Sequence, residues 1–324
     1  MRLRSRLGRT SKYWSPNSHS SATTRPSASS IRLAADAHIG RVRLRVADLE
    51  RALAFYRDVL GLRVEREWRA SVALAPQVHG GNAGPEPGRE LIILEERPGI
   101  ARRPMRPRTT GLYHVALLLP SRRELGRALL GLRAAGYRLR GMSDHAVSES
   151  LYLDDPDGNG LEIYADRPRE RWPVQGGVVL MTVDPMDVEG VIAAGRESPE
   201  RWSGLPPGTV VGHVHFTVSN MERAVLFYRD VIGFDVGMQV PTLTAVSAGG
   251  YHHHLNLNTW AGDGAPPDSD TVAGLVSWEL RVPEDQSRRA LIERLAAAGA
   301  LADPSSDVTA LDPDRIPLEV AAVA

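Results

Sequence analysis

Two stretches of this sequence place histidines where their chemistry would matter. His114 lies within GLYHVALLLP, an apolar run that begins at Gly111 and has the composition of a buried strand. A histidine there is either a core residue satisfied by a hydrogen bond or a metal ligand or proton carrier, because its ordinary pKa is close to neutral. The second stretch, GGYHHHLNLNTW, holds three adjacent histidines, His252, His253 and His254. Both stretches are candidates for a site.

The three adjacent histidines are expected in a strand, where side chains alternate between the two faces. On that expectation His252 and His254 share one face, and His253 lies on the other with Leu255 and Leu257. A bulge or local twist would change the alternation. The sequence therefore leaves both His253 and His254 open as the residue that faces a pocket.

The stretch SDHAVSESLYLDDPDGNGLEIY carries polar groups on both sides of a turn. Its DPDGNG segment has the Asp and Gly residues that favour tight reversal. The resulting hairpin would bring Tyr152 close to Glu162, with His145 a short distance before them. Each residue alone is ordinary, but their order resembles the His, Tyr and Glu of the last unit of extradiol ring-cleaving dioxygenases, and this resemblance implies a second candidate set.

A repeat supplies the elements that must position these residues. IGRVRLRVADLERALAFYRDVLGL, from Ile39, aligns without a gap with VGHVHFTVSNMERAVLFYRDVIGF, from Val211, and half of the positions are identical. Each copy begins with alternating apolar residues, which predicts a strand, and continues with helical spacing. His213 lies in the strand of the second copy, where the first copy has Arg41.

The helix that follows each strand has recognisable ends. Asp48 and Asn220 have the side chains that cap helix N-termini. Gly61 and Gly233 have the place of the glycine that ends a helix. A weaker repeat, in which GLYHVALLLP corresponds to GLVSWELRVP from Gly274, interleaves with this pair.

The two repeats predict four units, each a strand, a helix and several further strands. They span about residues 39–98, 111–166, 210–260 and 274–323, and we number them first to fourth.

The predicted fold class is α+β, with two tandem domains of two units each. The first domain is expected at 36–168 and the second at 209–324. Residues 169–208, rich in Pro, Gly and Trp at their ends, are expected to be a linker. Residues 1–35 are expected to be a disordered tail, since the first thirty are basic, rich in Ser and Thr and free of acidic residues.

Composition excludes several function classes. The 39 basic and 39 acidic residues balance, so no general attraction to nucleic acid or to anionic membranes is expected. The absence of cysteine excludes disulfides, thiolate metal sites and a cysteine nucleophile. No apolar run is long enough to span a bilayer, and a cytoplasmic location is expected.

This layout, together with the helix DLERALAFYRDVLGL, resembles the vicinal oxygen chelate superfamily, which includes glyoxalases, fosfomycin-resistance proteins and extradiol dioxygenases. The resemblance covers nearly the whole chain after residue 38. It implies βαβββ units whose mixed sheets curl into cups around one metal. Ligands in the superfamily come from the first and last strands of a unit. The matching positions here are Arg41, His114, His213 and Ser277 in first strands and Glu162 and Glu319 in last strands.

The way the units pair decides which of these residues meet. Pairing in sequence order gives two incomplete sites, one of which contains Arg41, and arginine does not bind metal because it stays protonated. Pairing the second unit with the third joins His114, His213 and Glu162. Two histidines and one carboxylate form the facial triad of non-haem Fe(II) sites. The first and fourth units would then hold Arg41, Ser277 and Glu319 without a metal.

Within the superfamily the chain most resembles bacterial catechol 2,3-dioxygenases with two tandem modules. This implies an extradiol dioxygenase that cleaves a small aromatic diol with O₂ at Fe(II), with Mn(II) as the alternative metal. The metal ligands would be His114, His213 and Glu162. Catalytic roles would belong to His145, Tyr152 and either His253 or His254. Assembly into a homo-oligomer stays open.

Two rivals share the same fold. A glyoxalase-like isomerase or a thiol transferase would need a fourth ligand, which could be His254, or Glu319 if the units pair differently. A drug-sequestering protein would bind a small molecule in an aromatic-lined cup without a metal. Four Phe, six Trp and eight Tyr make a rich aromatic lining the weaker expectation.

Overall fold

The structure is a computed structural model in which residues 32–78, 89–105, 108–198, 202–303 and 309–322 are described. They belong to one compact unit that spans residues 31–324. Most of the predicted tail lies outside the described residues. The part that is described contacts the third unit, because Arg32 forms an ion pair with Asp235 at 2.7 Å and the Leu33 N–H donates to the Gly233 carbonyl.

Each of the four units contains the predicted strand and helix followed by further strands. The first consists of β1 (His38–Val46), α1 (Leu49–Tyr56), β2 (Arg63–Trp68), β3 (Ser71–Ala75) and β4 (Ile92–Glu96). The second consists of β5 (Gly111–Leu119), α2 (Arg122–Ala134), β6 (Gly141–Asp144), β7 (Ser148–Asp154) and β8 (Gly160–Asp166). The third consists of β11 (Val210–Thr217), α4 (Met221–Leu226), η2 (Phe227–Ile232), β12 (Asp235–Val240), β13 (Leu243–Ser247) and β14 (Leu255–Asn258).

The fourth unit departs slightly from the others in its described part. It consists of β15 (Gly274–Arg281), α5 (Asp285–Ala297), β16 (Thr309–Leu311) and β17 (Pro317–Ala321). An isolated bridge between Leu301 and Ala310 lies where a further strand is expected, next to residues 304–308, which are not described.

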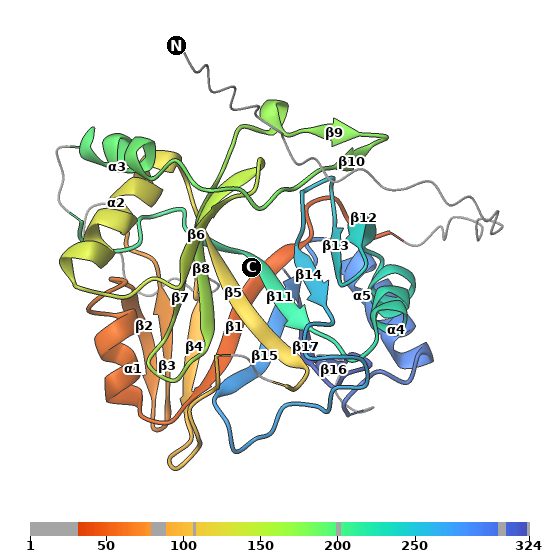
Figure 1. The fold of residues 1–324 in the computed structure, drawn as a ribbon. Helices are drawn as coiled ribbons and strands as arrows, with labels where there is room; N and C mark the ends of the chain where they lie inside the picture. The colour runs from red at the N-terminus through yellow and green to blue at the C-terminus, as the bar shows by residue number, and fades with distance from the viewer. Residues whose placement is uncertain (1–31, 79–88, 106–107, 199–201, 304–308, 323–324) are drawn as a thin grey trace, which may run out of the picture. The chain divides into compact units, whose positions relative to one another are not determined.

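The sheets pair the units in the crossed order (Figure 1). The second and third units form an eight-stranded sheet in the order β12-β13-β14-β11-β5-β8-β7-β6. The first and fourth units form a seven-stranded sheet in the order β16-β17-β15-β1-β4-β3-β2. Both are mixed, since β5 runs antiparallel to β11 and parallel to β8, as β1 does to β15 and β4. The predicted α+β class and the pairing of the second unit with the third are confirmed.

The helix ends follow the sequence signals. The Asp48 side chain accepts from the Arg51 N–H and the Asn220 side chain from the Arg223 N–H. Gly233 has a left-handed backbone at φ 102°, where an L side chain would be strained. One difference is that α4 continues as the π-helical turn η2.

Units that follow each other in sequence are joined by buried hydrogen bonds between a helix and a turn. Tyr56, at the end of α1, donates to the Asp155 carboxylate at 3.1 Å. Tyr228, in η2, donates to the Asp312 carboxylate at 2.9 Å. Both carboxylates lie in DPD turns, so the repeated FYRD and DPD segments hold the first unit on the second and the third on the fourth.

The predicted linker contains structure of its own. It includes η1 (Arg169–Arg171), β9 (Val174–Gln175), β10 (Val178–Val179) and α3 (Val188–Arg196). Helix α3 packs closely on α2, where Gly126 lies against Gly195 and the Val191 carbonyl. Domain boundaries at 36–168 and 209–324 stay a prediction. Among the described helices, none combines the length and apolar character needed to cross a bilayer.

Candidate metal and acid–base site

Three neighbouring strands bring the predicted ligands together. Strand β5 carries His114, β8 carries Glu162 and β11 carries His213. Ala116 of β5 is the register partner of Glu162 on one side and of His213 on the other. His114 lies two residues before Ala116 and therefore on the same face of the sheet. The three side chains converge because β5 is central between the strands that carry the other two.

The donor atoms of these side chains meet at one point. Glu162 Oε2 lies 3.0 Å from His114 Nε2 and 3.2 Å from His213 Nε2. The two Nε2 atoms are 3.4 Å apart. The three residues form a cluster whose geometry can hold a metal ion, and we call His114, Glu162 and His213 the triad.

Burial and neighbouring side chains set the protonation of His213 and Glu162. His213 is 2 % exposed, and burial lowers its pKa to about 4 although the Glu162 charge opposes this. Burial alone would raise the pKa of Glu162, but the adjacent His213 and His114 bring it well below its ordinary value. At neutral pH the site therefore holds an ionised carboxylate and a neutral His213, which is the protonation state that a cation requires.

The donor set fits a divalent cation. Two ligands that each lie about 2.1 Å from a metal ion at right angles are separated by about 3.0 Å, close to the separations seen here. The Glu162 carboxylate is 3 % exposed, and a buried anion is costly unless a cation compensates it. Two imidazoles and one carboxylate suit iron, manganese or zinc better than calcium or magnesium.

Tyr152 and His145 form a hydrogen-bonded pair next to the triad. Tyr152 is the register partner of Glu162 across the β7–β8 hairpin, as the turn predicts. The Tyr152 hydroxyl lies 2.6 Å from His145 Nε2, and the His145 Nδ1 lies 2.6 Å from the Thr182 carbonyl. A carbonyl only accepts, so His145 carries a proton on Nδ1, and its Nε2 in the neutral ring accepts from the phenol.

Thr182 was not foreseen from the sequence. It lies in the predicted linker, which continues the edge of the sheet through reciprocal hydrogen bonds between Asp144 and Asp184. A backbone carbonyl has no side-chain signal, so nothing in the sequence identifies this acceptor.

The three adjacent histidines precede β14, which begins at Leu255. The expectation of strict alternation is wrong, because His252 and His253 lie outside the strand with their Nδ1 atoms only 2.8 Å apart. The His253 ring centroid lies 4.1 Å from that of His213. His254 instead contacts Phe234 and Tyr251, and its Nδ1 accepts from the Ala248 N–H at 3.1 Å.

His215 is a further buried histidine at this site, and the sequence reasoning missed it. Its ring centroid lies 4.9 Å from that of His114, and its Nε2 lies 2.9 Å from the Asn258 amide nitrogen, which donates to it. The signal was present, because His213 and His215 are two residues apart in one strand and share a face.

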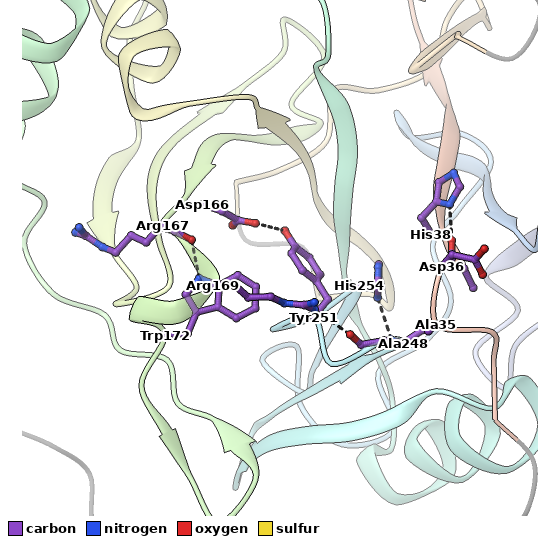
Figure 2. Close-up of a pocket in the computed structure, with 12 residues that line it drawn as sticks. Ala35, Asp36, His38, Asp166, Arg167, Arg169, Trp172, Ala248, Tyr251 and His254 are labelled. Carbon is purple, nitrogen blue, oxygen red and sulfur yellow. Dashed lines mark hydrogen bonds between the residues drawn. The ribbon is translucent and has the colours of Figure 1, made fainter.

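A cavity of about 430 Å³ lies next to His254 (Figure 2). Asp166, Trp172, Tyr251 and His254 line one side, and residues 35–38 line the other. The triad does not line this cavity, but Asp166 and Tyr251 connect its wall to the histidines, as described below.

The corresponding positions of the seven-stranded sheet are occupied differently. The Ser277 hydroxyl donates to Glu319 at 2.6 Å. Arg41 forms ion pairs with Glu279 at 3.1 Å and Glu90 at 3.9 Å. The carboxylates that pair with Arg41 are thus different from the one that accepts from Ser277.

Comparison with known proteins places this site in context. The family model of the Glyoxalase/Bleomycin resistance protein/Dioxygenase superfamily matches residues 38–163 and 210–311. A catechol-2,3-dioxygenase of Bacillus subtilis (strain 168) is 42% identical over 267 residues, 82% of this chain and 89% of that protein. A biphenyl-2,3-diol 1,2-dioxygenase 3 of Rhodococcus globerulus is 33% identical over 112 residues, 35% of this chain and 54% of that protein.

Two solved structures share the fold. One is a protein of Bacillus subtilis subsp. subtilis str. 168 described as a dioxygenase, with a TM-score of 0.58 at 13% identity, covering 90% of this chain and 86% of that one. The other is glyoxalase I from Zea mays, with a TM-score of 0.50 at 14% identity, covering 89% and 92%. At these identities the likeness shows the fold alone.

Proposed function

The chain belongs to the Glyoxalase/Bleomycin resistance protein/Dioxygenase superfamily, and on that premise we propose that it is an extradiol dioxygenase that inserts O₂ into a catechol-type substrate. The observation that carries the proposal is the convergence of the triad from two separate units, with donor atoms 3.0 to 3.4 Å apart. The name of the Bacillus subtilis relative, identical at 42% of positions, supports the reaction class.

His114, His213 and Glu162 would hold the metal. Two histidines and one carboxylate favour Fe(II), and Mn(II) accepts the same ligands. When bound, the metal supplies Lewis acidity toward a substrate oxygen and, in the case of iron, redox chemistry with O₂. The three protein ligands leave coordination positions for substrate, which is the arrangement of catalytic rather than structural sites.

Tyr152 would orient the substrate. Burial and the Glu162 charge raise the pKa of Tyr152 well above its ordinary value, so the residue stays a phenol at neutral pH. A phenol beside the metal ligands can exchange its hydrogen bond between His145 Nε2 and a substrate oxygen. His145, fixed by the Thr182 carbonyl, is placed to take up a proton from the phenol and return it.

His253 would act on the opposite side of the site. Its ring packs on that of His213, and its Nε2 is buried without a hydrogen-bond partner among the described residues. A buried unpaired nitrogen next to the triad is available to a substrate hydroxyl. His254, which contacts the cavity side, is the weaker candidate for this role.

Oxygen uptake with catechol tests the proposal. Purified protein loaded anaerobically with Fe(II) is expected to consume O₂ when catechol is added and to form a yellow ring-opened product. His213→Ala is expected to abolish both, while Glu319→Gln, at the matching position of the other sheet, retains them. Uptake that is absent at every iron loading would overturn the proposal. Isomerisation of a hemithioacetal by Ni- or Zn-loaded protein would favour the glyoxalase-like rival instead.

A further inference from the structure

Asp166 accepts two hydrogen bonds at the cavity end of the eight-stranded sheet. Its Oδ1 lies 2.9 Å from His252 Nε2. Its Oδ2 lies 2.9 Å from the Tyr251 hydroxyl (Figure 2). A carboxylate only accepts, so both neighbours donate to it. Tyr251 thereby uses its single proton, and its oxygen accepts from Tyr164 at 2.9 Å. Asp166 is therefore held by two donors on adjacent residues.

The bond to Asp166 determines which nitrogen of His252 carries the proton. In the neutral ring only one nitrogen does, and donation to Asp166 places it on Nε2. His252 Nδ1 is then unprotonated and can only accept a hydrogen bond. Its neighbour at 2.8 Å is His253 Nδ1, which must supply the hydrogen for that contact to be a hydrogen bond.

The same reasoning continues to His253. If His253 carries its proton on Nδ1, its Nε2 is unprotonated and can only accept. This Nε2 is buried without a hydrogen-bond partner among the described residues. In this order His253 Nδ1–H donates to His252, and His252 Nε2–H donates to Asp166. His253 Nε2 is then left as an unpaired acceptor beside His213.

We propose that Asp166 and His252 are positioning residues that fix the tautomer of His253, so that His253 presents an unprotonated Nε2 to the substrate hydroxyl. This rests on the proposed function for its substrate, but the order of hydrogen-bond donors is a property of the protein alone. The alternative is a doubly protonated His252, which would donate to both Asp166 and His253. His253 would then carry its proton on Nε2 and could not accept from a hydroxyl.

Nitrogen-15 NMR of the imidazole rings reads the tautomers directly. Full-length protein is measured metal-free and with Zn(II), which is diamagnetic and has no redox chemistry. The expected pattern is a proton on Nε2 of His252 and on Nδ1 of His253. A His253 protonated on Nε2, or a doubly protonated His252, would overturn the proposal.

Two substitutions of His252 separate positioning from packing. In His252→Asn an amide oxygen replaces the acceptor near the Nδ1 position, so His253 should keep its tautomer and kcat should fall only a few-fold. In His252→Phe the ring volume remains but the acceptor is lost. This variant should lower kcat by on the order of 10- to 100-fold with KM little changed, and His253 should lose its preference for Nδ1–H. A purely structural role predicts the reverse order of the two variants.

His38 provides a matched control for the His252 variants. His38 lines the same cavity, and its Nδ1 lies 2.8 Å from the Asp36 carbonyl, outside the donor chain. His38→Asn should leave kcat and the His253 tautomer unchanged. A wild-type protein with the expected tautomers but no catechol cleavage would overturn the proposed function. An active protein in which His252→Phe has the wild-type kcat would overturn the positioning role alone.

Discussion

The Tyr228 phenol donates to the Asp312 carboxylate, 84 residues later in the chain, across a fully buried contact of 2.9 Å. Burial raises the pKa of Asp312 to about 7, although the Ile316 N–H and Tyr228 oppose the shift. Burial likewise raises the pKa of Asp155, which accepts from Tyr56, to about 6, although the hydrogen bonds from Asn159 and Tyr56 oppose the shift. The bond that joins consecutive units is therefore also a pH-dependent one.

We expect deprotonation of Asp312 to lower the stability of the fold as pH rises from about 4 to about 7. Its pKa is raised in the folded state, so the folded protein binds this proton more tightly, and the contribution is lost as pH rises through the folded pKa. Asp312→Asn removes the titration while the amide oxygen still accepts hydrogen bonds. The free energy of unfolding of the variant, relative to that of wild type, should therefore increase by on the order of 2–4 kcal/mol from pH 4 to pH 8.

Urea unfolding at several pH values measures this difference. Asp285→Asn is the control, since the Asp285 side chain is 72% exposed, and its difference from wild type should stay flat. An Asp312→Asn difference that is equally flat would show that burial does not perturb this carboxyl.

Metal binding is expected to stabilise the protein through Glu162. A ligand that binds only the folded state at one hundred times its Kd adds about 2.7 kcal/mol. Thermal unfolding under anaerobic conditions should shift upward with Fe(II) or Mn(II) in wild type and not in Glu162→Gln. Glu319→Gln, whose carboxyl accepts from Ser277 in the other sheet, should shift as wild type does. An undiminished shift in Glu162→Gln would place the metal elsewhere.

Tyr152→Phe is expected to slow catalysis more than it weakens binding. The substitution removes the hydroxyl that lies 2.6 Å from His145 Nε2, and loss of a general acid–base partner lowers rates by about 10²-fold or more. Steady-state kinetics should show the loss in kcat. Tyr137→Phe removes a hydroxyl that donates to the Asp154 carbonyl at 2.8 Å, and it should cost about 1 kcal/mol of stability with kcat preserved. Equal kinetic effects of the two variants would contradict the role of Tyr152.

Gly126→Ala is expected to destabilise the contact between α2 and α3. In an open helix this change would stabilise by up to about 1 kcal/mol. A Cβ at Gly126, however, would lie 2.1 Å from the Val191 carbonyl oxygen, and overpacking costs about 1–3 kcal/mol. The steric cost should exceed the gain in helix propensity, so Gly126→Ala should unfold at a lower urea concentration than wild type. Gly141→Ala is the control, since no atom lies within 4 Å of its added Cβ. A more stable Gly126→Ala would mean that α3 does not hold this position.

The repeat made much of this fold readable from the sequence. Helix caps at Asp48 and Asn220 follow from matching positions in the copies. The pairing of the second and third units, and the meeting of His114, Glu162 and His213, come from those positions together with the superfamily resemblance, which indicates the strands that carry ligands.

The hydrogen-bond partners could not be read in the same way. His252 and His253 precede their strand, so the period of two that assigns faces does not apply to them. Thr182 contributes a carbonyl, and Asp166 reaches His252 from the end of a different strand. Such contacts depend on the path of loops and strand ends, which no local pattern encodes.

The crossed sheets also have a consequence for synthesis on the ribosome. Strand β1 is among the first to emerge, but its neighbour β15 ends only at Arg281, so one edge of β1 waits unpaired while more than two hundred residues are translated. An apolar strand with an unpaired edge can pair with other nascent chains on the same polysome. Arg41, Arg43 and Arg45 alternate along β1, and like charges on an open edge discourage such encounters. We therefore expect these arginines to disfavour such pairing until β15 has been translated.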